Sequence, residues 1–369
     1  MKVKAKKNNT AIDKLSAEIE KIRNKTARIS FFVFDTKGVP NGELEYIYEM
    51  ALVLKNTGYN IRMLHTENEF VGVGGWLNDE CASLPHYNVT SDNVDFSPAD
   101  FLIIPDACCN IVGYTKELPC KRILLARNLN YFFEAFPIAT TLNDLRIHDA
   151  IVATDKIGET LKSLFDDVRI TKIPQMVKKI FYENKNPLKK LFINIIAKNA
   201  SDIETFVKSF YLKYPAYKWV SFRPLRNLPR NEFADALKDA AITVWMDSDT
   251  DFGTSAIETM ASGSILVAKV PENEPDWGFN KDGIKNNAIW FYDVRNTSDL
   301  LASVVQTYLH RGIPSQLTES MENTAIEYSE DSITPIINKT FNSYFVDREN
   351  EFTVALSALK NNLENNSKN

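Results

Sequence analysis

AITVWMDSDTDFGTSAIETMASGSILVAKV, residues 241–270, is the stretch that decides the fold. Its first six residues form an apolar run, which is typical of a strand buried on both faces of a parallel sheet. A polar loop containing Gly253 follows, then a helical segment at 256–261 and a second apolar run at 265–270. The stretch therefore predicts a strand, a loop, a helix and a further strand.

The same alternation extends through both halves of the chain. In the N-terminal half we expect strands at 28–34, 60–66, 100–107, 121–128, 148–155 and 171–177. In the C-terminal half we expect them at 191–198, 217–222, 241–246, 265–270 and 288–293, followed by a helical tail from Ser298 with breaks at Pro314 and near Pro335. Strands that alternate with helices make right-handed βαβ units, so we predict an α/β protein with two doubly wound, Rossmann-like domains.

The polar segment 182–190 contains Pro187 and is interpreted as an interdomain linker. The expected organisation is a tail and an amphipathic helix over 1–27, an N-terminal domain over 28–182, a C-terminal domain over 191–330, and C-terminal helices with a polar tail over 331–369.

Composition limits the possible function classes. The 369 residues are 44% apolar and 25% charged with a formal net charge of -5, which is typical of a soluble globular protein and gives no basic footprint for nucleic acid. No apolar run reaches the roughly 18 residues that a transmembrane segment needs. The four cysteines form neither a C-x-x-C pair nor a secreted disulfide pattern, so we expect reduced thiols, a cytoplasmic location and no metal site.

The loop and helix over 246–263 form the candidate binding site, because ligands of open α/β sheets lie beyond the carboxyl ends of the strands. The amides of Gly253, Thr254 and Ser255 at the helix start are expected to bind a diphosphate, helped by the helix dipole. Glu258 lies one turn further and is placed to accept hydrogen bonds from ribose hydroxyls.

These residues resemble a motif of the retaining GT-B glycosyltransferases of the sucrose-synthase and mannosyltransferase-like group, Glu-x-Phe-Gly-x4-Glu-Ala-Met-Ala-x-Gly. The chain has Thr250-Asp251-Phe252-Gly253 and then Glu258-Thr259-Met260-Ala261-Ser262-Gly263. The resemblance implies a GT-B fold with C-terminal helices that cross back, and sugar transfer with retention from a nucleotide-diphosphate sugar, which is a donor substrate and not a cofactor. The second Glu of the family motif, matched by Glu258, holds the ribose.

The chain departs from the family pattern at several positions. Thr250 stands where the family has a sugar-contacting Glu, with Asp249 and Asp251 on either side as possible substitutes. The basic pair that neutralises the diphosphate is reduced to Lys198, with Arg223 and Arg226 as candidate replacements. Gly42 lies in a loop, 38–43, that resembles the family's glycine-rich loop, and Ala126-Arg127-Asn128 stands where a His is common. The candidate catalytic residues are thus Thr250, Asp251 and Asn128.

Other interpretations of the same residues remain open. Ser255 and Glu258 fit a helix capping box, Gly42 fits a simple turn, and the lone cations fit solvated charges. Residues 247–258 place acidic side chains at EF-hand positions 1, 3, 5 and 12, although Phe252 stands where that loop needs glycine. The Asp-x-Asp pattern after a strand also fits a metal-dependent, single-domain GT-A transferase.

A second class of function is a GT-B-like binding or structural protein that lost its catalytic groups. For the enzyme, the acceptor is a glycan, a small molecule, a protein or a modified nucleic acid.

Overall fold

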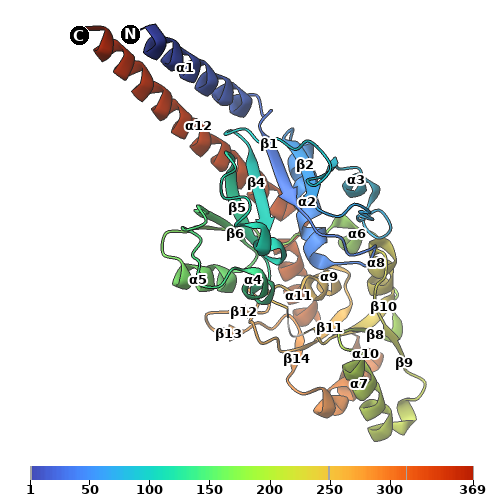
Figure 1. The fold of residues 1–369 in the computed structure, drawn as a ribbon. Helices are drawn as coiled ribbons and strands as arrows, with labels where there is room; N and C mark the ends of the chain where they lie inside the picture. Colours follow the sequence, from blue (N-terminus) through green and yellow to red (C-terminus); the bar gives the residue numbers. More distant parts are fainter. Residues whose placement is uncertain (1, 248–249, 313, 369) are drawn as a thin grey trace.

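The computed structural model of the chain describes residues 2–247, 250–312 and 314–368 (Figure 1). Its N-terminal half holds a seven-stranded parallel sheet in the order β3-β2-β1-β4-β5-β6-β7. These strands are β1 (Arg28–Phe32), β2 (Asn60–His65), β3 (His86–Asn88), β4 (Phe101–Pro105), β5 (Lys121–Ala126), β6 (Asp149–Val152) and β7 (Arg169–Lys172).

The C-terminal half holds a five-stranded parallel sheet in the order β14-β11-β10-β8-β9. It consists of β8 (Lys190–Ile196), β9 (Ser221–Pro224), β10 (Ala240–Trp245), β11 (Ile265–Lys269) and β14 (Ile289–Phe291), beside a hairpin of β12 (Phe279–Asn280) and β13 (Gly283–Ile284). Two parallel sheets, each with a reversal in strand order, confirm the predicted pair of doubly wound units.

The helices are α1 (Lys2–Arg23), α2 (Gly42–Asn56), α3 (Asp79–Ala82), α4 (Leu129–Ala135), α5 (Asp155–Leu164), α6 (Lys179–Tyr182), α7 (Ala200–Lys213), α8 (Arg230–Asp239), α9 (Thr254–Ala261), α10 (Ser298–Arg311), α11 (Ser315–Glu327) and α12 (Glu330–Lys368), with short 3-10 turns η1 (Asp106–Ile111), η2 (Pro215–Tyr217) and η3 (Val294–Asn296). The expected break at Pro314 is present. The expected break near Pro335 is wrong, because α12 continues through that proline.

Two strands differ from their predicted positions. The strand expected at 171–177 is β7 at Arg169–Lys172, and the strand expected at 217–222 is β9 at Ser221–Pro224. The first predicted run contains Pro174, which follows the end of β7, and the second begins at the last residue of η2, which starts at Pro215. After β7 the backbone therefore runs from the sheet towards the C-terminal half, carrying Gln175.

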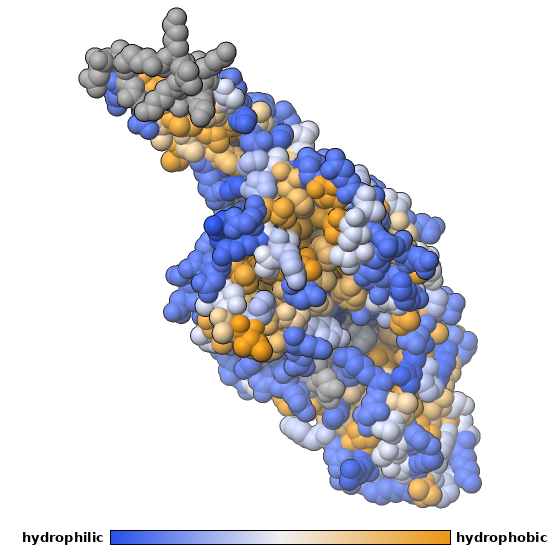
Figure 2. Space-filling model, in the orientation of Figure 1, coloured by the Kyte–Doolittle hydropathy of each residue, from blue (hydrophilic) through white to orange (hydrophobic). Residues whose placement is uncertain are grey.

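The C-terminal helices cross back to the N-terminal half, as the fold prediction requires. Phe341 and Phe345 of α12 are buried against the first sheet, and Phe345 stacks on Phe101 at 4.9 Å between ring centroids. The far part of α12 lies beside α1, where Arg23 and Glu349 form an ion pair at 2.7 Å (Figure 1). Figure 2 shows apolar side chains along this projecting pair, and both apolar and hydrophilic areas over the rest of the visible face. In the described part of the chain, no helix is both long and apolar enough to cross a membrane.

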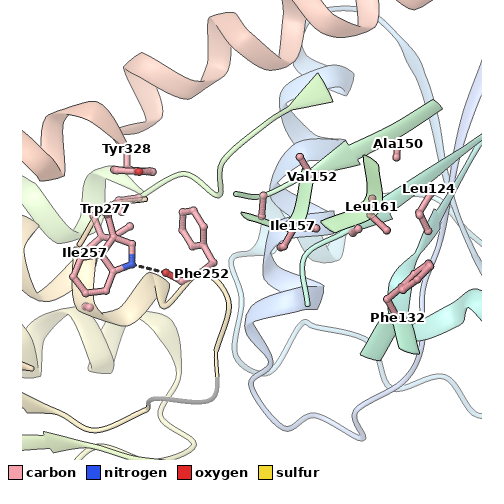
Figure 3. Packing of buried hydrophobic residues seen from close by; sticks show 14 of the residues in the cluster. Leu124, Phe132, Ala150, Val152, Ile157, Leu161, Phe252, Ile257, Trp277 and Tyr328 are labelled. Atoms are coloured by element: carbon pink, nitrogen blue, oxygen red, sulfur yellow. Dashed lines mark hydrogen bonds between the residues drawn. The ribbon is translucent and has the colours of Figure 1, made fainter. Parts of the chain in front are cut away.

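One buried cluster joins the two halves. Figure 3 shows Leu124, Val152 and Leu161 of the first half on one side of it, and Phe252 and Trp277 of the second half on the other. The indole nitrogen of Trp277 donates a hydrogen bond to the carbonyl oxygen of Phe252 at 2.5 Å. This bond fixes the turn that carries the chain from β10 into α9.

Gly253 forms that turn, and its geometry generates a stability prediction. Its φ is +72°, and a Cβ there would lie 2.9 Å from the Trp245 ring. Gly253→Ala should lower the free energy of unfolding by about 1–2 kcal/mol for the left-handed backbone, and by about 1–3 kcal/mol more for the clash. Gly58→Ala is the matched control, because Gly58 has a φ of +91° just after the end of α2 and no heavy atom within 4 Å of the added carbon. Denaturant unfolding that gave equal losses for both variants would contradict the role of Trp245.

Candidate functional site

A cavity of about 240 Å³ lies between the two halves. Loops at the carboxyl ends of strands line it, and they include those after β1, β8 and β10, which flank the points where strand order reverses. Of the predicted site residues, eight line the cavity: Gly42, Asn128, Lys198, Thr250, Gly253, Thr254, Ser255 and Glu258. Asp251, Arg223 and Arg226 are not among its lining residues.

The N-terminus of α9 opens into the cavity. Gly253 is its N-cap residue, and no side chain caps the helix. Ser255 lies inside the first turn and accepts a hydrogen bond from the Trp245 indole at 3.0 Å. The capping-box interpretation of Ser255 and Glu258 is therefore wrong. The Thr250 hydroxyl accepts the amide hydrogen of Gly253 at 3.2 Å, which stabilises the turn.

Arg127 is a cavity residue that the predicted set of site residues did not contain. It follows β5, and its guanidinium donates to Gln175 Oε1 at 3.0 Å and to Thr254 Oγ1 at 3.3 Å. Thr254 also donates to Gln175 at 2.7 Å, so these three side chains form one network at the start of α9. Gly42 packs against the same guanidinium, because a Cβ at this position would lie 3.2 Å from Arg127 Nη2. A cation from the first half thus stands at a helix N-terminus of the second half.

Glu258 is buried and forms an ion pair with Arg230 at the start of α8. The same guanidinium pairs with Glu45 of α2 at 2.5 Å. The backbone N–H of Arg230 donates to the Trp76 carbonyl at 3.0 Å. Phe181 and Phe233 flank it, at 4.8 and 5.2 Å from its central carbon to their ring centroids. Arg230 therefore joins a carboxylate of each half inside the cavity wall.

The pKa values of this group reflect crowded burial. Burial raises the pKa of Glu258 to about 7, with Glu45 adding to the rise and Arg230 opposing it. Burial alone would lower the pKa of Arg230, but the attraction of Glu258 and Glu45 raises it above its ordinary value. Arg230 consequently stays charged while its two partners compete for it.

Asn128 and Asp251 have structural contacts at the edge of the cavity. The Asn128 side chain is the N-cap of α4 and accepts the amide hydrogen of Asn130 at 2.9 Å. Asp251 accepts the amide hydrogen of Leu129 at 2.6 Å, across the boundary between the halves. Asp251 thus ties the β10–α9 loop to the start of α4.

The predicted cations are spread over different positions. Lys198 lines the cavity and pairs with Asp247 at 3.5 Å. Arg226 is exposed and donates to the Lys198 carbonyl at 3.1 Å. Arg223 donates to Asn194 and to the Ala236 carbonyl, at 2.9 and 2.8 Å, beside the second sheet. These hydrogen bonds hold the Arg223 guanidinium away from the cavity, where it packs against the second sheet.

The two metal-based alternatives do not agree with the fold. An EF-hand loop is entered by a helix, whereas β10 precedes this loop, and Glu258 pairs with Arg230. Asp249, which belongs to both acidic patterns, lies outside the described residues. A GT-A enzyme has a single α/β domain, whereas this chain has two doubly wound sheets.

Comparison with known proteins bears on the fold. No protein-family model and no curated protein sequence matches the chain. Solved structures do match it. Sucrose-phosphate synthase from Thermosynechococcus elongatus aligns with a TM-score of 0.59 at 11% identity, over 87% of this chain and 100% of that one. The pneumococcal O-GlcNAc transferase GtfA, in complex with UDP and GlcNAc, aligns with a TM-score of 0.58 at 11% identity, over 87% and 99%.

An alpha-glucosyltransferase in complex with UDP and a 13-mer DNA containing an HMU base aligns with a TM-score of 0.56 at 11% identity, over 84% of this chain and 99% of that one. The fold of these neighbours agrees with the two Rossmann-like sheets of this chain. The chain has the GT-B fold.

Arg230→Met tests the ion-pair junction. Above pH 7, where Glu258 is ionised, the substitution keeps similar bulk but leaves Glu45 and Glu258 buried without their cation, so we expect a loss of about 3–5 kcal/mol in the free energy of unfolding. Arg226→Met removes an exposed guanidinium from the same loop and should change that free energy by less than about 0.5 kcal/mol. A loss of similar size for both variants, measured by denaturant titration, would argue against the junction.

Glu258→Gln tests the raised pKa. Folded Glu258 holds its proton up to a pH of about 7, against an ordinary pKa of 4.5, so its contribution to stability is complete at low pH and declines between these values as pH rises. The free energy of unfolding of the wild type minus that of Glu258→Gln should therefore fall from pH 4.5 to pH 7 and level off above. Glu232→Gln, at an exposed position of α8, controls for the loss of a surface carboxylate. A difference that rises with pH would refute the assignment.

Proposed function

We propose that the chain transfers a sugar from a nucleotide-diphosphate sugar to an acceptor held in the cavity between its two halves. The observation that carries the proposal is the juxtaposition of the α9 N-terminus, Arg127 and Glu258 on one cavity of a GT-B fold. We also propose that 28–182 and 191–330 act as separate lobes, and that the protein is cytoplasmic, where its free, buried cysteines stay reduced.

The diphosphate is assigned to the start of α9. Backbone N–H groups of an uncapped helix N-terminus attract anions, and the helix dipole adds to this attraction. Arg127 reaches Thr254 at that end, and Lys198 lines the same cavity. In transfer, these two cations would stabilise the charge that develops on the departing diphosphate.

The nucleoside is assigned to the wall that follows. Glu258 lies one helical turn from the anion-binding end, and its carboxyl group is assigned to the ribose hydroxyls. Leu225, Leu228 and Phe233 add an apolar surface beyond it, suited to the face of a base. Arg230 would hold Glu258 in place for the ribose.

The transferred sugar has fewer contacts assigned in the C-terminal half. Thr250 lines the cavity, yet its hydroxyl is already bonded to Gly253, and Asp251 is bonded to Leu129. We propose transfer with retention on the resemblance of the motif. The same two bonds favour the second candidate, a protein that binds the nucleotide without transfer, and release of nucleoside diphosphate from a donor separates the two.

Thermal shift with UDP and with UDP-, GDP- and ADP-sugars tests binding. A ligand at a hundredfold excess over its Kd stabilises the folded protein by about 2.7 kcal/mol. Glu258→Ala should remove most of this stabilisation, because a ribose contact is lost. Glu204→Ala, on the exposed face of α7, should retain it. If no nucleotide raises the melting temperature, or if the two variants respond alike, the proposed site is wrong.

A further inference from the structure

A pair of carboxyl groups lies on the N-terminal side of the cavity. Glu43 lies in the first turn of α2 and lines the cavity with 3% of its surface exposed. Asp106 follows β4 and is fully buried, and the two side chains are within hydrogen-bonding reach. They come from the loops after β1 and β4, the two strands between which the first sheet reverses its order.

The two partners differ in what holds them. Asp106 accepts three backbone amide hydrogens, those of Ala107 at 2.9 Å, Arg127 at 2.6 Å and Asn128 at 2.5 Å. Neither oxygen of Glu43 has a well-directed donor among the described residues. Two adjacent carboxyls can hydrogen-bond only if one carries a proton, and the amides favour the ionised form of Asp106. The shared proton therefore resides on Glu43, whose two carboxyl oxygens are buried in the cavity wall.

We propose that Glu43, paired with Asp106, is the catalytic acid–base group that moves the acceptor's proton during transfer. This inference rests on the proposed function and adds a residue to it. A structural role is already filled by Asp106, which organises the loop after β5. A second buried carboxyl beside it destabilises the fold and contributes no bond of its own to the loop.

The transfer step leaves the Glu43–Asp106 pair with one proton, as it was before the step. The acceptor oxygen bonds to the anomeric carbon, and the electron pair of the sugar–phosphate bond leaves with the diphosphate oxygen. Glu43 gives its proton to that oxygen and receives the acceptor's hydroxyl proton on its carboxyl group. Arg127, which donates its backbone amide to Asp106 and its guanidinium to the α9 end, places the pair beside the diphosphate site.

Burial and the neighbouring Asp106 raise the pKa of Glu43 well above its ordinary value. The titratable and charged groups around the pair are Arg127 after β5, Asp251 after β10, Tyr46 of α2, and Cys108 and Cys109 of η1. Among these groups Arg127 favours the ionised form of Glu43, and Asp106 opposes it. Because the step needs one proton on the pair, turnover should fall both where the pair loses that proton and where it gains a second.

Glu43→Gln tests the proposal. The matched control is Glu49→Gln, since Glu49 lies on the same helix, is 2% exposed, also lacks a donor, and lines a different cavity. The donor is the nucleotide sugar that most stabilises the wild type, water is the acceptor, and released nucleoside diphosphate is measured against pH. UDP affinity is measured for each variant by calorimetry.

Glu43→Gln should lower turnover about 100-fold or more, the usual scale of acid–base catalysis, and remove its pH dependence. Its UDP affinity should stay within twofold of the wild type, and Glu49→Gln should keep wild-type turnover. Equal losses in both variants, turnover of Glu43→Gln within threefold of the wild type, or UDP binding by a wild type that releases no nucleotide would overturn the proposal. A wild type that binds no nucleotide would instead refute the proposed function itself.

Discussion

The structure depends on one buried guanidinium. Arg230 pairs with Glu45 of the first half and with Glu258 of the second, while its backbone reaches the carbonyl of Trp76. A cation in this position requires carboxylates on both sides, because the loss of its hydration must be offset by paired charge. The requirement fixes how α2, α8 and α9 approach one another. The shape of the cavity follows from this approach.

The same contacts divide the cavity into two electrostatic regions. At one end, Arg127, Lys198 and the N-terminus of α9 present positive charge and free amides. At the other end, the carboxyl groups of Glu258 and Glu45 share the single cation of Arg230, so this end has no excess of positive charge. A ligand with an anionic centre and a neutral, hydroxylated end fits this division in only one orientation. The proposed nucleotide-diphosphate sugar would therefore lie with its diphosphate at the α9 end.

Much of the fold was predictable from the sequence, because buried parallel strands leave continuous apolar runs and helices leave periodic ones. The β10–α9 loop was also recognisable, since a left-handed glycine and a helix start follow from local geometry. Arg127, Arg230 and Glu43 were not identified, because a single charged residue in sequence resembles a solvated one. Their burial results from contacts between distant segments, such as Arg230 with Glu45. Two strands were misplaced for a local reason, since the run continues past the last residue of β7 and begins before the first residue of β9.

Thr250 shows how the site divides its tasks. Its hydroxyl stabilises the turn at Gly253, and Asp251 holds the start of α4, so both side chains serve the geometry of the loop. Under the proposed function, the C-terminal half then contributes mainly the N-terminus of α9 for the diphosphate and Glu258 for the ribose. The lining residues that the first half contributes to the remaining space include Asn41, Gly42, Glu43 and Asn128. A sugar beyond the diphosphate would thus be recognised from the N-terminal side, where a carboxyl pair and two helix starts meet. Under this proposal the C-terminal half binds the nucleotide and the N-terminal half carries out the transfer. The ion pairs of Arg230 hold the two halves at a fixed separation.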